Sequence, residues 1–500
     1  MKTILEDLFL QACKRPDHAS FCDETESLTF SDTAQRCQAI GTALLHAGAC
    51  REPVLVFLPR SARMIACFFG VLAAGCCYVP VDAEMGERRI RSILSQVQPR
   101  FALCDGGTLT LLQSYGFSGA ALDPSRFADG AVDAPLLERT AADTLDVDAA
   151  YIVFTSGSTG APKGVVGTHR AMLDYCHQIT TVLGVQDDDV FAMQAPLYVD
   201  ACLKEILSAL RCGATVWLVP KPLFMTPVPL VTYLNDHGVT ILCWVVPALT
   251  MISALRTFDE VTPKTLRTVA FGSEVFPPKQ LRLWRAHVLA RYLNLYGPTE
   301  CTGMTCWYEV ERDFSDDERV PIGKPFDNAQ VLLLDAQNHL ASEGELCIRG
   351  TSLCAGYYKD PVRTAAVFVQ NPCNDAFPDR IYRTGDLGRR NARGELEFLG
   401  RKDNQIKHMG HRIELGELEA AAQSLEGVTA ACAVFDPVRS VLALGFSGAL
   451  TEAALLTALR ARVPSYLLPS RTVRMDALPT TPNGKTDRKA VEALCFARKE

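Results

Sequence analysis

Extended apolar runs alternate with helical runs between residues 28 and 300, and this alternation limits the possible folds more than any other feature. VLVFLP at 54–59 and CYVPVD at 77–82 have the composition of buried strands, and the apolar run at 64–75 between them has that of a helix. Strands that alternate with helices favour parallel sheets covered by helices on their faces. The alternation further predicts helices at 169–183, 201–211 and 228–237, strands at 191–196, 214–220 and 240–247, and strands that run into glycine-bearing loops at 265–274 and 291–300.

A glycine-rich loop follows a predicted strand at 151–154, where YIVF leads into TSGSTGAPKG at 155–164. Glycines let a backbone approach an anion closely, and the hydroxyls and Lys163 supply donors and charge for phosphate oxygens. The loop lacks the GK[ST] ending of a Walker A loop and the GxGxxG pattern of a dinucleotide fold. We interpret it as a phosphate-binding loop, and a plain flexible surface loop is the alternative. Ligands gather beyond the carboxyl ends of parallel strands, so this loop and those at 271–274 and 296–300 are expected to face one crevice.

The composition is that of an ordinary globular chain, with 48% apolar and 21% charged residues. Its 500 residues predict two or more domains, and its formal net charge of −7 argues against nucleic acid as a partner. The N-terminal stretch mixes charges into its apolar run, and no apolar run reaches the length of a membrane span. We therefore expect a cytoplasmic protein with no membrane partner. The 19 cysteines form no CxxC pair and are expected to be reduced and mostly buried.

The pattern changes beyond about residue 315, where shorter strands between glycine and aspartate turns predict a mainly β subregion. After Asp403, a helix at 417–426 and strands at 429–435 and 441–446 predict a small α+β unit. The predicted fold class is therefore α/β, with a large N-terminal domain of αβ-layered sheets that includes the β subregion, and a small, mobile α+β C-terminal domain. The predicted boundaries of the two domains are 1–402 and 403–500.

A series of motifs in a fixed order resembles the adenylate-forming (ANL) superfamily, and within it the stand-alone amino-acid adenylation domains of non-ribosomal peptide synthesis. The motifs span nearly the whole chain, and their order is what makes the resemblance specific. They are LTF (28–30), AAGCCYVPVD (73–82), TSGSTGAPKG (155–164), NLYGPTE (294–300), GELCIRG (344–350), YRTGDL (382–387), GRKDNQIKHMGHRIELGELE (400–419), VPSYLLP (463–469) and NGKTDRK (483–489).

The resemblance implies that ATP and a carboxylate give an acyl-adenylate and pyrophosphate, with Mg²⁺ as the metal, before transfer to a thiol. It places Glu300 on Mg²⁺, Thr299 near the α-phosphate, and Tyr296 with Gly297 at the adenine. Asp386 would accept the ribose hydroxyls with help from Arg401, although from the residues alone Asp386 reads equally as a turn aspartate. The residues implied for the β- and γ-phosphates are Thr155, Ser156, Gly157, Ser158, Thr159, Gly160 and Lys163.

The resemblance assigns further roles to the C-terminal region. Lys485 of NGK would bridge the substrate carboxylate and the α-phosphate, which suits a reaction that concentrates negative charge, whereas alone it reads as an exposed tail lysine. Asp403 would be the hinge about which the small domain turns, and an ordinary linker residue is the alternative. His408 and His411 replace the apolar or aromatic residues frequent at their positions, and we expect them on the solvent side.

Asp200 and Lys204, in LYVDACLKEILSAL, carry most of the substrate information. Asp200 stands where a helix N-cap is expected, and Lys204 follows one turn later on the same face. The resemblance implies that Asp200 binds the α-ammonium of an amino acid, whereas a surface ion pair is the alternative. Because a buried lysine needs a partner, a glutamate- or aspartate-like substrate is the first hypothesis. The remaining pocket residues implied by the resemblance are Ala201, Trp244, Ala270, Gly272, Leu295, Gly303 and Met304.

The chain ends soon after Lys485 without a carrier segment, so a separate phosphopantetheinylated carrier protein is the expected acceptor. A D-alanine–carrier protein ligase is the nearest alternative, although Lys204 fits a methyl-sized pocket poorly. An acyl- or aryl-CoA ligase would leave Asp200 without an ammonium to bind. A catalytically inactive adenylate-binding protein is the alternative outside the enzymes.

Overall fold

The structure is a computed structural model that describes residues 2–127, 130–156, 162–402, 405–437, 439–480 and 486–497. Its chain forms two compact units. The first comprises Met1–Asp82, Gln98–Val153 and Gly164–Gly400, and the second comprises Ala83–Val97, Phe154–Lys163 and Arg401–Glu500. The domain boundary after residue 402 stays a prediction.

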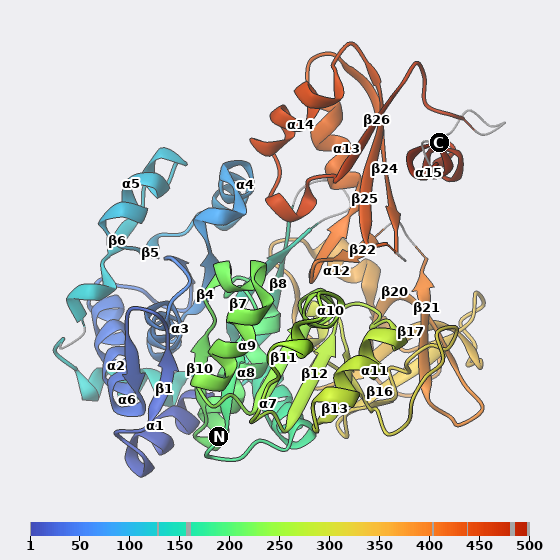
Figure 1. The fold of residues 1–500 in the computed structure, drawn as a ribbon. Coiled ribbons are helices and arrows are strands. Elements are labelled where there is room, and N and C mark those ends of the chain that lie inside the picture. Colours follow the sequence, from blue (N-terminus) through green and yellow to red (C-terminus); the bar gives the residue numbers. More distant parts are fainter. Residues whose placement is uncertain are drawn as a thin grey trace. The chain divides into compact units, whose positions relative to one another are not determined.

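A large mixed sheet in the first unit contains nine strands among the described residues (Figure 1). Its strands from β13 to β1 run parallel, and antiparallel strands close both edges. The parallel arrangement confirms the prediction from the alternating pattern. In spatial order the strands are β15 (Lys324–Pro325), β14 (Cys306–Glu309), β13 (Arg291–Tyr296), β12 (Thr268–Gly272), β11 (Ile241–Val245), β9 (Val190–Met193), β10 (Thr215–Leu218), β1 (Ala19–Cys22) and β2 (Ser27–Thr29).

A second sheet pairs β3 in parallel with both β4 and β5. Parallel pairing also joins β4 to β7 and β5 to β6, and the short β18 adds an antiparallel edge. The predicted glycine loop follows β7. The spatial order is β18 (Gly356–Tyr357), β8 (Lys163–Thr168), β7 (Ala149–Thr155), β4 (Cys77–Val81), β3 (Pro53–Phe57), β5 (Phe101–Leu103) and β6 (Ala120–Leu122).

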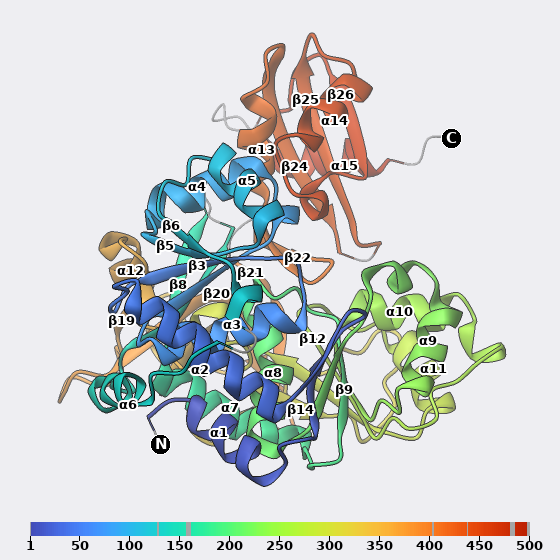
Figure 2. The ribbon, with the colours of Figure 1, turned by 90° about the vertical axis from the view of Figure 1, so that its left-hand side faces the viewer.

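Helices cover both faces of the nine-stranded sheet (Figure 2). One group shares a hydrophobic core with strands of both sheets, and a second group forms a separate core on the other face around the buried Trp284. The first group includes α1 (Leu5–Lys14), α2 (Phe30–His46), α3 (Ala62–Ala73), α7 (His169–Leu183) and α8 (Leu203–Cys212). The second group is α9 (Pro227–Asp236), α10 (Val246–Ala254) and α11 (Pro278–His287). Outside both groups, the first unit has α5 (Gly106–Ser114), α6 (Ala134–Asp143) and α12 (Pro361–Val367).

Local signals fix the ends of the helices that lead to the site. The Thr168 hydroxyl accepts a hydrogen bond from the Ala171 amide at 3.2 Å and starts α7. Gly184 ends α7, and Gly213 ends α8, each in the left-handed conformation that glycine adopts without strain. The sequence therefore signals where both helices stop and where α7 begins.

The mainly β subregion predicted beyond residue 315 is an antiparallel sheet. Its strands are β16 (Ala329–Leu334), β17 (Glu343–Gly350), β19 (Phe368–Gln370), β20 (Arg380–Arg390) and β21 (Leu396–Arg401).

The second unit has the predicted α+β character and its own apolar core around Leu418, Leu444 and Leu455. Its elements are α4 (Glu87–Val97), β22 (Gln405–His408), β23 (His411–Glu414), α13 (Leu415–Gln423), β24 (Val428–Asp436), β25 (Val441–Gly448), α14 (Glu452–Arg460), β26 (Arg471–Met475) and α15 (Arg488–Phe496).

We expected His408 and His411 to lie on the solvent side, and this prediction is wrong. His408 is buried, and its ring meets Phe435 edge to face. His411 stacks on Tyr466 with ring centroids 3.7 Å apart, and burial lowers the pKa of His411 to about 4. Both imidazoles therefore serve as aromatic packing groups.

The prediction that most of the cysteines are buried is confirmed. All 19 lie in the described part of the chain as free thiols, and most are buried.

Candidate active site

A cavity opens at the carboxyl ends of four neighbouring parallel strands, β9, β11, β12 and β13. The ladder pairs Val245 with Gly272 and Gly272 with Leu295, so three of these strands end at the same level. Side chains from the strand ends and the following turns therefore meet at one edge of the sheet, as expected for a ligand site in such a fold. The lining residues are Gln194, Ala195, Ala201, Lys204, Cys243, Trp244, Val245, Ala270, Phe271, Gly272, Ser273, Leu295 and Met304.

The structure brings together most of the residues predicted to bind the substrate. All of them line this cavity except Asp200 and Gly303, which flank lining residues in the chain. Sequence reasoning missed Gln194, Ala195, Cys243, Val245, Phe271 and Ser273. A signal for the missed residues was present, because each of them lies within a strand segment predicted at 191–196, 240–247 or 265–274.

Two glycines allow the backbone to close around this site. A Cβ atom at Gly272 would lie 2.4 Å from the carbonyl oxygen of Leu295 on the neighbouring strand. At Gly297, a Cβ atom would lie 2.1 Å from the carbonyl oxygen of Gly303. Real Cβ atoms do not approach other atoms so closely, so neither position accepts a side chain without moving the backbone.

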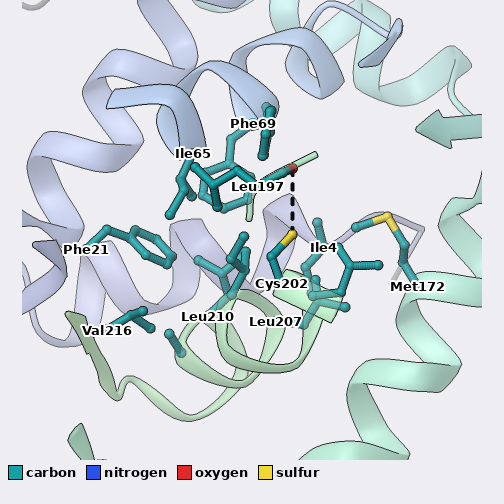
Figure 3. Close-up of a cluster of buried hydrophobic side chains, with 14 of the residues drawn as sticks. Ile4, Phe21, Ile65, Phe69, Met172, Leu197, Cys202, Leu207, Leu210 and Val216 are labelled. Atoms are coloured by element: carbon teal, nitrogen blue, oxygen red, sulfur yellow. Dashed lines mark hydrogen bonds between the residues drawn. The ribbon is translucent and has the colours of Figure 1, made fainter. Parts of the chain in front are cut away.

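In α8, the helix beside the cavity, every residue from Leu203 to Leu210 is buried. Figure 3 shows the apolar cluster to which its leucines contribute. Leu207 and Leu210 pack with Ile65 and Phe69 of α3 in the main core cluster. Just before α8, Cys202 belongs to the same cluster, and its thiol lies 3.8 Å from the carbonyl oxygen of Leu197. This segment therefore lies in apolar surroundings.

Lys204 is a buried cation in this apolar setting, with only 5% of its surface exposed. Its Nζ donates a hydrogen bond of 2.7 Å to the carbonyl oxygen of Ala201, and its side chain lines the cavity. A surface ion pair between Asp200 and Lys204 is thereby excluded.

Asp200 is not the N-cap of the helix. It begins the 3-10 turn η3 (Asp200–Cys202), and α8 starts at Leu203 without a side-chain cap. The Asp200 carboxylate instead accepts a hydrogen bond of 3.1 Å from the Thr299 hydroxyl. Burial raises the pKa of this carboxyl group, while the charge of Lys204 and the Thr299 hydrogen bond act in the opposite direction.

The residues predicted for the nucleotide form a second group in the first unit. Glu300 is fully buried and accepts a hydrogen bond of 2.8 Å from the Tyr357 hydroxyl. The Tyr296 hydroxyl donates a hydrogen bond of 2.5 Å to Asp386. The Tyr357 contact was missed because Tyr357 lies on β18, far along the chain from Glu300. Thr299 connects the predicted substrate residues to the predicted nucleotide residues, because it precedes Glu300 in the chain and its hydroxyl donates a hydrogen bond to Asp200.

Four other predicted residues belong to the second unit. Thr155 and Ser156 lie at the end of β7, and within the described part of the chain the buried Thr155 hydroxyl has no hydrogen-bond partner. The Ser156 hydroxyl donates to the carbonyl oxygen of Arg412. Lys163 begins β8 and Arg401 ends β21. The remaining predicted residues lie outside the described part of the chain: Gly157, Ser158, Thr159, Gly160, Asp403 and Lys485.

The sequence profile of the AMP-binding enzyme family matches residues 8–358. The chain therefore belongs to this family of adenylate-forming enzymes. It is 31% identical to tyrocidine synthase 1 of Brevibacillus parabrevis over 96% of this chain and 44% of that protein. It is 32% identical to tyrocidine synthase 3 of the same organism over 98% of this chain and 8% of that protein. The chain thus spans less than half the length of these relatives.

Solved structures support the same fold. Holo-PA1221, described as an NRPS protein containing adenylation and PCP domains, matches with a TM-score of 0.83 and 26% identity over 98% of this chain and 84% of that chain. The o-succinylbenzoate CoA synthetase of Bacillus subtilis matches with a TM-score of 0.83 and 19% identity over 100% of this chain and 99% of that chain, which supports the fold alone. The predicted α/β fold and the predicted superfamily are confirmed. Within the described residues, no helix combines the length and apolar character needed to cross a membrane.

Proposed function

We propose that the protein activates an amino acid with ATP as an aminoacyl-adenylate and transfers it to the phosphopantetheine thiol of a separate carrier protein. The observation that carries this proposal is the hydrogen bond between Thr299 and Asp200. It joins a carboxylate suited to a substrate ammonium to the segment expected to hold the α-phosphate. The proposed ammonium site and the proposed phosphate site would therefore be adjacent, as the attack of an amino acid's carboxylate on the α-phosphorus requires.

The nucleotide residues fit ATP and Mg²⁺ in their chemistry. Glu300 supplies the oxygen ligand that Mg²⁺ prefers, and no group of three His, Cys, Asp or Glu residues in the described part of the chain could hold a metal. A single carboxylate completed by phosphate oxygens and water suits Mg²⁺, which when bound would neutralise charge on the phosphates. Tyr296, Gly297 and Asp386 would hold the nucleoside with Arg401, and the loop from Thr155 to Lys163 would hold the outer phosphates.

We assign Lys485 to the reacting carboxylate and α-phosphate, where its positive charge would stabilise the negative charge of the transition state. Asp403 is proposed as the hinge of a mobile C-terminal domain.

The proposed substrate carries an acidic side chain. Lys204 uses one ammonium proton for the Ala201 carbonyl oxygen and otherwise meets a cavity lined by apolar groups such as Trp244, Leu295 and Met304. A substrate carboxylate would pair with this buried charge, whereas an uncharged side chain would leave it unpaired. Glutamate- or aspartate-like acids are therefore favoured over neutral amino acids.

Amino-acid-dependent exchange of pyrophosphate into ATP tests both parts of the proposal. Glutamate or aspartate should be activated ahead of glutamine, asparagine, alanine and leucine, and Lys204→Met should abolish the preference. Lys279→Met removes an exposed lysine from α11 and is the matched control, which should leave the preference intact.

Each contrary outcome identifies an alternative. Exchange with alanine that is indifferent to Lys204→Met would contradict the acidic substrate and favour a D-alanine–carrier protein ligase. Exchange with acids that have no amino group would favour an acyl- or aryl-CoA ligase. Absence of exchange with any acid would favour an inactive adenylate-binding protein.

A further inference from the structure

Gln194 follows β9 directly and lines the cavity with its side chain half-buried. The backbone amide of Val245, at the end of β11, donates a hydrogen bond of 2.9 Å to Oε1 of Gln194. A backbone amide only donates, so the side-chain atom that faces Val245 must be the oxygen, and the orientation of the Gln194 amide is thereby assigned. Among the described residues, its Nε2 group has no hydrogen-bond acceptor. Gln194 therefore keeps a donor available at the cavity.

The backbone around Gln194 is also held in place. The guanidinium of Arg60 donates hydrogen bonds to the carbonyl oxygens of both chain neighbours, at 2.7 Å to Met193 and 3.3 Å to Ala195. Arg60 interacts electrostatically with the buried Glu205, whose pKa burial raises to about 7. Neither of these two charged residues lines the cavity. Arg60 thus acts on the cavity by fixing the position of the Gln194 amide, which is preorganised at both its backbone and its oxygen.

The other polar side chains that line the cavity do not compete with the donors of Gln194 and Lys204. The indole nitrogen of Trp244 already donates a hydrogen bond of 2.7 Å to a backbone carbonyl oxygen. Burial raises the pKa of Cys243, which is therefore a neutral thiol and a weak donor. The hydroxyl of Ser273 can either donate or accept, so it does not select between ligands.

Gln194 and Lys204 therefore present donors to the same cavity. An ammonium has no acceptor, and the acceptor of Gln194 is turned toward Val245. A carboxylate fits this pair of donors, because it has two acceptor oxygens, no donor, and a charge opposite to that of Lys204. A carboxamide of the same shape would turn its NH₂ group toward one of the two donors, and this donor would lose its hydrogen bond.

We propose, on the basis of the acidic substrate assigned above, that Gln194 is a specificity-determining residue whose Nε2 donates a hydrogen bond to the side-chain carboxylate of the substrate. One carboxylate oxygen accepts from Gln194, and the other pairs with Lys204. Lys204 then selects for the charge of the side chain, and Gln194 selects for an acceptor. The two contributions can be measured separately.

The variant Gln194→Glu replaces the Nε2 donor by an acceptor and keeps an oxygen for the Val245 amide. In the exchange assay, the ratio of kcat/KM for glutamate to kcat/KM for glutamine should fall about a hundredfold, because the substrate carboxylate would meet a like charge. Gln337→Glu makes the same chemical change at an exposed position and is the matched control. Its ratio should equal the wild-type ratio.

A pair of uncharged probes isolates the hydrogen bond from the charge of Lys204. Glutamine and 2-amino-4-nitrobutanoate have the shape of glutamate, but the nitro group has two acceptor oxygens and no donor. The nitro compound should inhibit glutamate-dependent exchange by the wild-type protein with an inhibition constant about fivefold lower than that of glutamine. This order should reverse in Gln194→Glu. The wild-type measurement decides the question even if the variant does not fold.

The outcomes separate this inference from the proposed function. Equal inhibition of the wild-type protein by the two probes, or stronger inhibition by glutamine, would overturn the role of Gln194 while a preference for glutamate that requires Lys204 stands. A wild-type ratio in Gln194→Glu would overturn the role of Gln194 in the same way. Absence of any acidic preference, unchanged by Lys204→Met, would overturn this inference together with the acidic substrate.

Discussion

Helices α3 and α8 belong to the same hydrophobic core and are buried to a similar degree. They differ in the kinds of residue that they bury. Nearly every residue of α3 is buried, and all of the buried ones are uncharged. α8 is equally buried yet contains Lys204, Glu205 and Ser208. The buried residues of α3 show that a helix in this core can be buried without charged groups, so the charged groups of α8 are not required by packing. The charged groups of α8 lower the stability of the folded state, and the adjoining cavity explains their presence.

The comparison predicts that substitutions in α3 change stability and that substitutions in α8 change specificity. Stability of the first unit can be followed separately, because all four tryptophans of the chain, at 217, 244, 284 and 307, lie in that unit. Urea unfolding monitored by tryptophan fluorescence therefore reports on the region that contains both helices.

The largest effect is expected for Phe69→Ala in α3. Truncation of a buried phenylalanine should lower the free energy of unfolding by about 4 kcal/mol, because it removes apolar contacts and leaves a cavity. The preference among amino acids in the exchange assay should not change. Leu255→Ala removes an exposed side chain and should leave the unfolding curve unchanged. An altered preference in Phe69→Ala would show that the division between the helices is wrong.

The second effect concerns the pH dependence of stability. A raised pKa means that the folded state holds the Glu205 proton more tightly than the unfolded state does. The associated stability is fully present below about pH 4.5 and is lost as the pH rises toward about 7. The loss should amount to roughly 3 kcal/mol, and Glu205→Gln should lack it. Unfolding curves for both proteins between pH 5 and 8 measure the difference, and equal slopes would contradict the raised pKa.

Asp200→Ala should lower kcat/KM about a hundredfold for every amino acid that the enzyme activates. The substrate ammonium would lose its charged partner, at a cost of roughly 3 kcal/mol. Exchange rates with several amino acids measure the effect. A loss confined to acidic amino acids would place Asp200 at the side chain of the substrate instead of the ammonium.

The smallest expected effect is on the stability of Lys204→Met. Replacing a buried charge by an apolar side chain of similar length should leave stability unchanged or raise it by about 1 kcal/mol. The same unfolding measurement applies, with Lys279→Met as the exposed control. A large destabilisation, comparable to that of Phe69→Ala, would make Lys204 a structural residue and remove the contrast between α3 and α8.

Local elements of the fold were largely predictable from the sequence. The helix expected at 169–183 is α7 with the same bounds, because Thr168 and Gly184 are strong end signals. The order of strands in the sheet was not predictable, since β9 lies between β10 and β11 through crossover connections that no local pattern encodes. The ring packing of His408 and His411 was missed for a similar reason: their aromatic partners are distant in the chain.

The residues of the candidate site that lie near the ends of strands were predictable. The family resemblance implied Trp244, Gly272 and Leu295, and the parallel register of their strands brings them to the same cavity. Glu205 was not identified, because a lysine followed by a glutamate on a helix is typical of a solvent-facing surface. Only the position of α8 between other elements shows that Glu205 is buried as well as Lys204.

The close backbone approaches at Gly272 and Gly297 separate the residues around the cavity into two classes for redesign. At these glycines a new side chain would collide with a neighbouring carbonyl oxygen, so their randomisation would produce mostly misfolded clones. Ala201, Lys204, Cys243 and Met304 present side chains to the cavity instead. A combinatorial library that keeps the glycines and varies these four positions would therefore explore new substrates at the lowest cost in folded protein.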